Sequence, residues 1–326
     1  MPPQGLSFAG PLPNLHIPQL PSSIVLSLPH HHLGDSWYCA DRDRTHCFFL
    51  VCPDTVARHT AWNIGHASSL DLKTWTNHGI VLRRGAPDTW DGICLATGSI
   101  LHHSGRFWMA YTGNWLGPQP AVGLAVSSDL RDWQKLVANP ITTIDEHYYT
   151  AASRGRRPLP HWRDPFLFEV DGSVHQLVCA TAAGGESSAG TIGAARSHDM
   201  SQWEMLPPLD VEPFAEELEC PQVVSAGTRH YLVFSTPAGL LLSDRAVPDQ
   251  PGNMYSMIGE SPLGPFRVAD PTPLLPTDMS DRPYAGRIIG IGDRHFLLGT
   301  IWSDAGDRIC DPIPVELTPT GVKARL

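Results

Sequence analysis

Three acidic residues, Asp35, Asp164 and Glu219, occupy one repeated position in this chain of 326 residues. Each of them stands eight residues before a turn residue that opens a short apolar run. Two carboxylates that flank a glycosidic bond carry out most glycosidase reactions: one donates a proton to the leaving oxygen, and the other attacks the anomeric carbon or activates water. A third carboxylate offsets positive charge in the transition state. The three acids therefore predict cleavage of glycosidic bonds, with the longer Glu219 as the proton donor.

The turns that define this position recur five times and indicate a repeated β structure. Their steps along the chain are 62, 67, 55 and 65 residues, and the turn residues are Asp43, Gly105, Gly172, Gly227 and Gly292. Apolar runs bounded by Gly, Asp and Ser are typical of strands, and self-similarity at a fixed period is typical of propellers. The equivalent positions in the other two repeats are Thr97 and Tyr284, which we expect to face the same channel. We predict an all-β fold, a five-bladed β-propeller with four strands in each blade.

A second repeat supports the same period. Residues 64–75, 122–133 and 192–203 share a Ser, an Asp, a Leu or Met, and a closing Trp. Because these tryptophans recur with the repeat, we expect them to be structural.

Five units of about 62 residues account for nearly the whole chain. We expect residues 1–29, which are rich in proline, to form an N-terminal arm on the outside or along the last blade. Residues 30–326 then form a single propeller domain. The longest insertion, 139–161, comes directly before Asp164, and long insertions beside a site are usually functional loops.

Composition excludes several classes of function. The net charge of −10 argues against nucleic-acid binding, and no apolar run is long enough for a membrane span. The seven cysteines are scattered without a CxxC pair, so neither a zinc site nor a disulfide framework is expected. The adjacent histidine pairs, 31–32 and 102–103, lack the spaced partners of a metal site. We expect no metal, no cofactor, no signal peptide and a cytoplasmic location.

Several short motifs resemble those of glycoside hydrolase family 32, which includes invertases, inulinases and levanases. They are LGDSW (33–37), TGSI (97–100), MAYTG (109–113), WRDPFLF (162–168) and ECP (219–221). The resemblance runs from about residue 30 to residue 300, with the motifs in family order. It implies a five-bladed propeller that acts on a small carbohydrate, a β-fructofuranoside or related furanoside, with retention of configuration and with transglycosylation as a side activity. It also implies that Asp35 is the nucleophile, Asp164 stabilises the transition state, Glu219 is the acid/base and Arg163 binds the sugar.

The chain departs from the family pattern at three places. The Trp-Met-Asn-Asp-Pro-Asn-Gly segment is absent, Gln222 stands where family members usually have Asp, and the chain ends soon after the fifth repeat, so we expect no C-terminal β-sandwich in it. We also expect substrate contacts from Trp90 and Asp91, with core packing as their alternative, and from Thr97 and Tyr284. A sugar-stacking rim is a further hypothesis, and its aromatic candidates are Trp62, Tyr148 and Tyr149.

Two other functions remain open at this stage. One is an inverting arabinofuranosidase or xylosidase like those of family 43, which share the propeller and a similar acid trio. The other is a sugar-binding propeller without catalysis. Retaining enzymes place their two carboxyl groups about 5–5.5 Å apart, and inverting enzymes about 6.5–9.5 Å apart.

Overall fold

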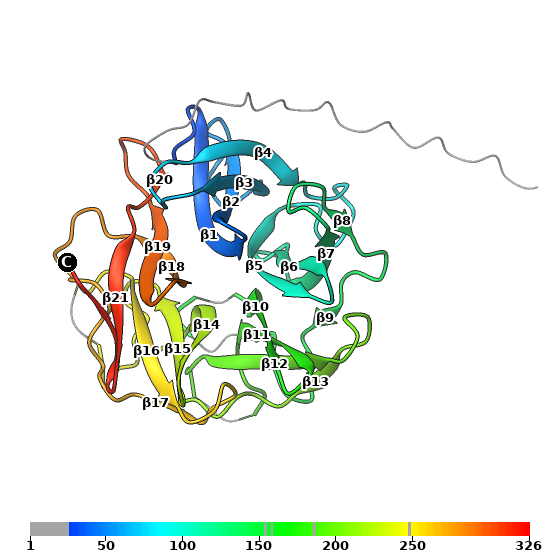
Figure 1. Cartoon of the computed structure of the whole chain (residues 1–326). Coiled ribbons are helices and arrows are strands. Elements are labelled where there is room, and N and C mark those ends of the chain that lie inside the picture. The colour runs from blue at the N-terminus through cyan, green and yellow to red at the C-terminus, as the bar shows by residue number, and fades with distance from the viewer. Residues whose placement is uncertain (1–25, 153–154, 158, 185–186, 247–248) are drawn as a thin grey trace, which may run out of the picture.

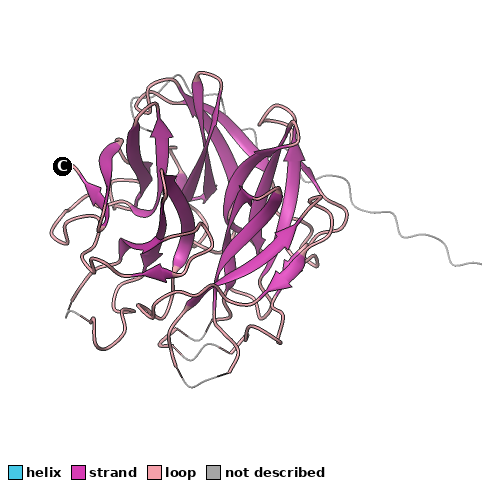
Figure 2. Ribbon diagram, turned by 60° about the horizontal axis from the view of Figure 1, so that its bottom comes forward, coloured by secondary structure: helices cyan, strands magenta, loops and turns pink. Residues whose placement is uncertain are grey.

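The computed structural model describes residues 26–326 except 153–154, 158, 185–186 and 247–248. This part of the chain contains strands and no helix. The strands form five antiparallel sheets around a central axis (Figure 1). A second view shows the sheets standing side by side as blades (Figure 2). The prediction of an all-β, five-bladed β-propeller is confirmed.

Each blade runs from an innermost strand to an outer edge. Blade 1 consists of β1 (His31–Asp41), β2 (Arg44–Pro53), β3 (Asn63–Ser69) and β4 (Thr76–Leu82). Blade 2 consists of β5 (Leu95–His103), β6 (Arg106–Gly113), β7 (Ala121–Ser127) and β8 (Gln134–Lys135), with β9 (Thr142–Thr143) beside β7. Blade 3 consists of β10 (Trp162–Val170), β11 (Ser173–Ala180), β12 (Thr191–Ser197) and β13 (Glu204–Leu206). Blade 4 consists of β14 (Glu219–Ala226), β15 (Arg229–Thr236), β16 (Asn253–Gly259) and β17 (Phe266–Arg267). Blade 5 consists of β18 (Tyr284–Ile291), β19 (Arg294–Ile301), β21 (Ile313–Thr318) and β22 (Gly321–Ala324), with β20 (Arg308–Ile309) beside β19.

The innermost strands form a closed ring around the axis. β1 contacts β5, β5 contacts β10, β10 contacts β14, β14 contacts β18, and β18 contacts β1. Apolar side chains fill the wedges between blades: Trp37 packs in one cluster with Met109 of blade 2, and Trp162 packs in another with Leu124. This packing holds residues that are far apart in sequence at one end of a shared channel.

Tight hairpins connect the first and second strand of every blade, as the repeated turn residues predicted. The loop of blade 2 has positive φ angles at Ser104 (50°) and Gly105 (72°), and the loop of blade 3 has them at Asp171 (49°) and Gly172 (74°). Two consecutive residues with positive φ are typical of the type I′ turn, which matches the twist of the flanking strands. Glycine adopts this conformation without the steric penalty of a Cβ atom.

The second repeat forms the connection from the third to the fourth strand. In blade 1 the Ser69 hydroxyl accepts a hydrogen bond from the Leu72 N–H at 2.8 Å, and Asp71 accepts from the N–H of Thr74 at 2.7 Å. The closing Trp75 is buried in the core. The same Ser–Asp turns recur in blades 2 and 3, where Trp133 and Trp203 pack against the hydrophobic clusters. The predicted structural role of the repeated tryptophans is confirmed.

The described start of the chain lies against the last blade. Ser27 forms an isolated bridge with Arg308 of β20, and the Ile309 N–H donates to the Leu26 carbonyl at 3.0 Å. Leu26 and Leu28 are buried in the same cluster as the strands of blade 5. Residues 26–28 therefore connect blade 5 to the start of blade 1. Residues 1–25 lie outside the described part, so the N-terminal arm stays a prediction.

Every innermost strand carries a β-bulge near the same end, where its pairing with the second strand slips. The slips fall between Leu33 and Ser36, Ala96 and Gly98, Arg163 and Phe166, Glu219 and Gln222, and Tyr284 and Arg287. A bulge bends the strand and changes the direction of its side chains. The five residues that lie eight positions before the turns all sit in or next to these bulges.

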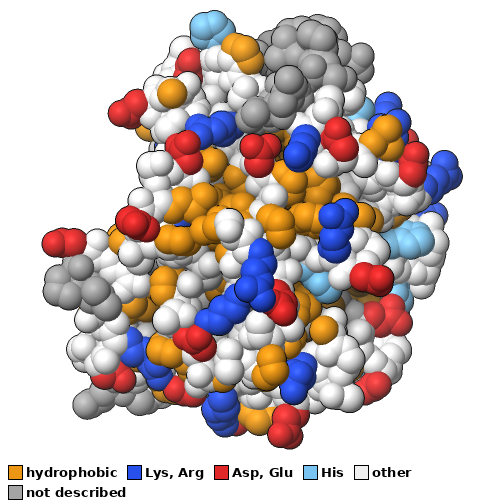
Figure 3. Space-filling view, turned by 60° about the vertical axis from the view of Figure 1, so that its left-hand side comes forward, with side chains coloured by type: hydrophobic (Ala, Val, Ile, Leu, Met, Phe, Trp, Pro, Cys, Tyr) orange, Lys and Arg blue, Asp and Glu red, His pale blue; other side chains and the backbone are white. Residues whose placement is uncertain are grey.

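Figure 3 shows the outer face on the side of blades 4 and 5. Hydrophobic side chains gather in a central band there, and acidic and basic side chains surround it without separating into regions of one sign. Among the described residues, no helix has the length and apolar character that a membrane-spanning helix needs.

Candidate active site

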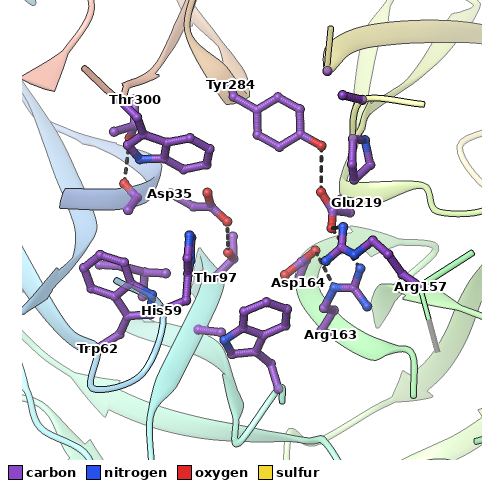
Figure 4. Close-up of a pocket in the computed structure, with 18 of the residues that line it drawn as sticks. Asp35, His59, Trp62, Thr97, Arg157, Arg163, Asp164, Glu219, Tyr284 and Thr300 are labelled. Atoms are coloured by element: carbon purple, nitrogen blue, oxygen red, sulfur yellow. Dashed lines mark hydrogen bonds and ion pairs between the residues drawn. The ribbon is translucent and has the colours of Figure 1, made fainter. Parts of the chain in front are cut away.

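A cavity of about 500 Å³ opens at the level of the bulges. All five repeated positions line it: Asp35, Thr97, Asp164, Glu219 and Tyr284. In Figure 4, Asp35 and Thr97 lie on one side of the cavity and Tyr284 and Glu219 on the other. Cavities of this size are typical of small-molecule sites. The repeat register thus predicted which side chains the fold brings together.

Asp35 lies in the bulge of β1 and is partly buried. Its carboxylate accepts a short hydrogen bond from the Thr97 hydroxyl, and the Cys220 thiol lies 3.7 Å from the same oxygen, Oδ2. Burial and the negative charge of Asp164 raise the pKa of Asp35 to about 6, although Thr97 and Arg287 oppose the shift. Asp35 is therefore mostly ionised at neutral pH.

Asp164 lies in the bulge of β10, where its φ angle is 62°. Its N–H donates to the Thr112 hydroxyl at 2.9 Å, and its Oδ2 accepts from the Cys220 N–H at 3.1 Å. Such a positive φ is strained for a residue other than glycine, and strained backbone often occurs at functional sites. These bonds hold the carboxylate in one orientation toward the cavity.

The side chains of Asp35, Asp164 and Cys220 bring their possible ligand atoms within 4.8 Å of one another. Burial, together with the charges of the two aspartates, raises the pKa of the Cys220 thiol well above its usual range. Metal binding by cysteine requires the thiolate. The neutral thiol therefore lies between two carboxylates that both line the cavity.

Glu219 begins β14 and faces Asp35 across the cavity. Its Oε2 accepts a hydrogen bond from the Tyr284 hydroxyl at 2.7 Å, and its Oε1 accepts one from Arg163 Nη2 at 2.9 Å. Burial raises the pKa of Glu219 to about 7; the carboxylates of Glu217 and Asp164 act in the same direction, and the nearby arginines oppose it. Burial thus favours the protonated form of this side chain.

Glu217 is a buried acid that the repeat register did not select. Its carboxylate contacts Arg163 Nη2, lies 3.2 Å from Arg157 Nη1, and lies 3.4 Å from His161 Nε2. Burial opposes ionisation, but the His161 and arginine contacts outweigh it and lower the pKa of Glu217 to about 2. The repeat register could not select it, because Glu217 precedes β14 and does not line the cavity.

Arg157 comes from the 139–161 insertion, which was predicted to be a functional loop. It lines the cavity and lies 3.4 Å from Oε1 of Glu219. Arg163, the expected sugar ligand, also lines the cavity, and its guanidinium lies between Glu217 and Glu219.

An aromatic wall centred on His59 forms part of the cavity lining. His59, with a φ angle of 73°, makes edge-on contacts with Trp62, Trp115 and Trp302 at ring-centroid distances of 5.7–6.0 Å. All four residues line the cavity. Of the three candidates for a stacking rim, only Trp62 is in this position.

Tyr148 and Tyr149, the other two candidates for the sugar-stacking rim, lie in a different environment. Tyr149 is fully buried and donates its hydroxyl to the Leu206 carbonyl at 2.6 Å. Tyr148 packs beside it, against the cluster between blades 2 and 3. Neither residue lines the cavity, so the rim hypothesis is wrong for both.

Trp90 and Asp91 are also outside the cavity, contrary to the expected substrate contacts. The Trp90 indole stacks on Tyr111 at 5.6 Å, over Gly113 and Gly123, where a Cβ atom would collide with it. Asp91 is buried, makes a short ion pair with Lys135, and accepts a bond from the Tyr111 hydroxyl at 3.2 Å. Both residues therefore pack in the core, which was the alternative to a substrate contact.

The fold and the site together define a five-bladed β-propeller whose central cavity holds the set of carboxylates found in glycosidases. The sequence model of the glycosyl hydrolases family 32 N-terminal domain matches residues 38–289. The chain belongs to this family, and the resemblance seen in its motifs is confirmed. The match begins just after Asp35 and includes the other two acids.

Known relatives agree with this assignment. The chain is 28% identical over 230 residues to the sucrose-6-phosphate hydrolase of Escherichia coli, a match that covers 65% of this chain and 44% of the relative. The chain thus spans less than half of the length of this curated relative.

Solved structures support the fold. An inulosucrase from Halalkalicoccus jeotgali bound to kestose aligns with a TM-score of 0.73 and 19% identity, over 94% of this chain and 91% of that protein. A family 32 β-fructofuranosidase from Bombyx mori aligns with a TM-score of 0.70 and 18% identity, over 94% and 65% of the two chains. A thermostable family 43 glycoside hydrolase aligns with a TM-score of 0.65 and 16% identity, over 91% and 93%. At these identities the similarity establishes the fold alone.

Proposed function

We propose that this protein is a retaining glycoside hydrolase that acts on β-fructofuranosides. The observation that carries the proposal is the arrangement of Asp35, Asp164 and Glu219 around one cavity, with an environment that favours ionised Asp35 and protonated Glu219 near neutral pH. An ionised nucleophile opposite a protonated acid is the starting state that retaining hydrolysis needs.

In the first step Glu219 donates its proton to the glycosidic oxygen while an Asp35 oxygen attacks the anomeric carbon. The bond to the leaving group breaks, and a covalent ester between the sugar and Asp35 forms. Positive charge develops on the sugar ring during this step. The carboxylate of Asp164, which the Cys220 N–H holds in place, stabilises that charge.

In the second step the ionised Glu219 takes a proton from a water molecule, and the hydroxide attacks the anomeric carbon. The ester to Asp35 breaks, so the sugar leaves with its original configuration and Glu219 regains its proton. A sugar hydroxyl that replaces the water gives transglycosylation by the same route.

The substrate class follows from the relatives and from the cavity. The similar proteins include a sucrose-6-phosphate hydrolase, a β-fructofuranosidase and an inulosucrase bound to kestose. The cavity combines carboxylates and arginines with an aromatic wall, as expected for a site that binds hydroxyl groups and the apolar face of a sugar. We infer a small fructoside as the substrate.

Methanolysis followed by NMR tests the proposal. The protein is incubated with sucrose, sucrose 6-phosphate, kestose and an aryl β-fructofuranoside in buffer that contains methanol. We expect methyl β-fructofuranoside, which does not mutarotate, and no such product from Asp35→Asn. Release of fructose or methyl fructoside of inverted configuration would favour the inverting alternative, and turnover of aryl arabinofuranosides alone would replace the substrate class. Sugar binding without turnover would refute the proposal and indicate a sugar-binding propeller without catalysis.

A further inference from the structure

Two arginines share their positive charge between two neighbouring glutamates at one side of the cavity. Arg163 Nη2 makes a short contact with Oε2 of Glu217 and a 2.9 Å contact with Oε1 of Glu219. Arg157 Nη1 lies 3.2 Å from Glu217 and 3.4 Å from Glu219. Figure 4 shows both guanidinium groups next to Glu219. Each glutamate therefore competes with the other for the same cations.

The surroundings of the two glutamates are unequal. The side chain of Glu217 is 1% exposed and has the His161 ring at 3.4 Å as a third partner. The side chain of Glu219 is 12% exposed, and its other oxygen faces the hydroxyl of Tyr284. Glu217 thus contacts the two arginines and the buried His161 ring, whose own pKa is lowered by burial, whereas Glu219 contacts the same arginines and a hydroxyl. The pKa of Glu217 is lowered while that of Glu219 is raised.

We propose that Glu217 is a positioning residue that binds the positive charge of Arg163 and Arg157, and so leaves on Glu219 the proton that the leaving oxygen requires. Glu217 does not line the cavity and does not touch the substrate in this scheme. The inference rests on the proposed function, because the proton on Glu219 is needed only if Glu219 is the acid that protonates the leaving oxygen.

Other charged and titratable groups also face the two glutamates. Asp164 of β10 acts in the same direction as Glu217 and raises the pKa of Glu219. The thiols of Cys179 and Cys220 are kept neutral by burial, which raises the pKa of both. Burial also raises the pKa of Tyr284, so that its hydroxyl stays neutral. Glu217 is therefore the fixed negative charge that contacts both arginines directly.

Removal of the charge on Glu217 has a defined consequence. In Glu217→Gln, Arg163 and Arg157 both still contact the carboxylate of Glu219, and Asp164 remains 3.7 Å from Nε of Arg163. An opposite charge within about 4–6 Å lowers the pKa of a carboxyl group by about 1–3 units. The basic limb of the kcat/KM profile should then move to lower pH by at least about one unit.

Glu216→Gln is the matched control. Glu216 is the adjacent residue and is also buried, but its carboxylate accepts from the N–H and Nε of Arg156, at 2.6 and 2.9 Å, outside the cavity. The same substitution there should leave the basic limb in place. Arg157→Gln removes one cation from Glu219 and should move the limb to higher pH. A merely structural role for these residues predicts no such pair of opposite shifts.

Infrared titration of the carboxyl C=O band gives a readout that does not depend on turnover. The band that disappears in Glu219→Gln belongs to Glu219, and its midpoint should fall in Glu217→Gln and rise in Arg157→Gln. Unchanged midpoints in variants that retain the wild-type circular dichroism would overturn the inference. If Glu217→Gln does not fold, a fall or no change in Arg157→Gln would also overturn it. Shifted midpoints in a protein that cleaves no fructoside would refute the proposed function alone.

Discussion

The guanidinium of Arg287 donates a hydrogen bond from Nη1 to the carbonyl oxygen of Cys220 at 2.7 Å. The same nitrogen reaches the Pro221 carbonyl at 2.6 Å, and Nη2 lies 3.4 Å from the carbonyl of Gly98. Arg287 belongs to blade 5, and its partners lie in or beside the bulges of blades 4 and 2. One buried side chain therefore connects the bulges of blades 2, 4 and 5, which position Thr97, Glu219 and Tyr284.

Arg287→Met should destabilise the protein strongly. The change leaves the carbonyls of Cys220 and Pro221 buried without their donor, and each unsatisfied group costs about 1–3 kcal/mol. We expect the free energy of unfolding, measured by urea denaturation, to fall by about 2–5 kcal/mol.

Arg294→Met is the control, because Arg294 is exposed on the next strand of the same blade and contacts the Phe296 ring at 5.2 Å. Surface substitutions usually change stability by less than about 0.5 kcal/mol. Equal stability of the two variants would show that the link between the bulges contributes nothing.

The five residues around the cavity could be predicted from the sequence because each lies at a fixed number of residues before a hairpin turn. The number of residues between the bulge and the turn is the same in each blade. The position of one acid relative to its turn therefore gives the equivalent positions of the others: Asp35, Asp164 and Glu219. Trp90 and Asp91 lie in a loop, where no repeat gives the direction of a side chain. The direction of the Trp90 indole depends on the space that Gly113 and Gly123 leave for it. That space is a property of the folded sheet.

The partners of the acids were also beyond the sequence. Glu217 and Arg157 lie 60 residues apart, and their contact depends on how the insertion folds back over blade 4. Loops of this kind follow no repeat, so no pattern assigns their side chains to a site. The family motifs identified Arg163 but not the competition between glutamates around it.

Glu219→Gln and Asp35→Asn should separate the two catalytic roles. Loss of the proton donor should reduce kcat/KM on sucrose by about 10²–10⁴-fold, and much less on an aryl fructoside, whose leaving group departs with little protonation. Asp35→Asn should abolish turnover of both, because no nucleophile remains. Steady-state kinetics on the two substrates checks this. Residual activity of Asp35→Asn comparable with that of Glu219→Gln would contradict the assignment.

Azide provides a second test of the same roles. With an aryl fructoside as substrate, the covalent intermediate should accumulate in Glu219→Gln, because no base activates water. Azide needs no such base, so it should attack the intermediate and restore turnover, with a fructosyl azide of retained configuration as the product. Mass spectrometry and NMR identify the product. Rescue with inverted configuration would indicate direct displacement without an intermediate at Asp35.

The kcat/KM profile should be narrow and bell-shaped. Asp35 must be ionised, and its pKa is raised to about 6 by burial and by Asp164, so activity should fall as the pH drops below about 6. Glu219 must be protonated, and its pKa is about 7, so activity should fall as the pH rises above about 7. This profile reports the groups of the free enzyme. An acidic limb near 4, the usual value for aspartate, would show that the cavity does not perturb Asp35.

Asp35→Asn should stabilise the folded protein at neutral pH while it abolishes activity. The folded pKa of Asp35 is about 6, above its ordinary value of 3.8. The folded chain therefore binds the proton more tightly, and the stability contributed by protonated Asp35 is present below pH 3.8 and lost as the pH rises through 6. Asparagine removes the charge, and a shift of this size corresponds to at most about 3 kcal/mol. We expect a gain of about 1–3 kcal/mol at pH 7 and none below pH 3.8, measured by urea denaturation at both.

Asp71→Asn should show the opposite sign. The N–H groups of Thr74 and Lys73 lower the pKa of Asp71 to about 2, so its ionised form stabilises the fold above the ordinary aspartate pKa, and this contribution disappears as the pH falls toward 2. The variant should be less stable than wild type at neutral pH and equal to it in strong acid. If Asp35→Asn behaved like Asp71→Asn, with a loss at neutral pH, the carboxylate of Asp35 would be a stabilising charge. The cavity would then lack the raised nucleophile pKa on which the acidic limb of the activity profile depends.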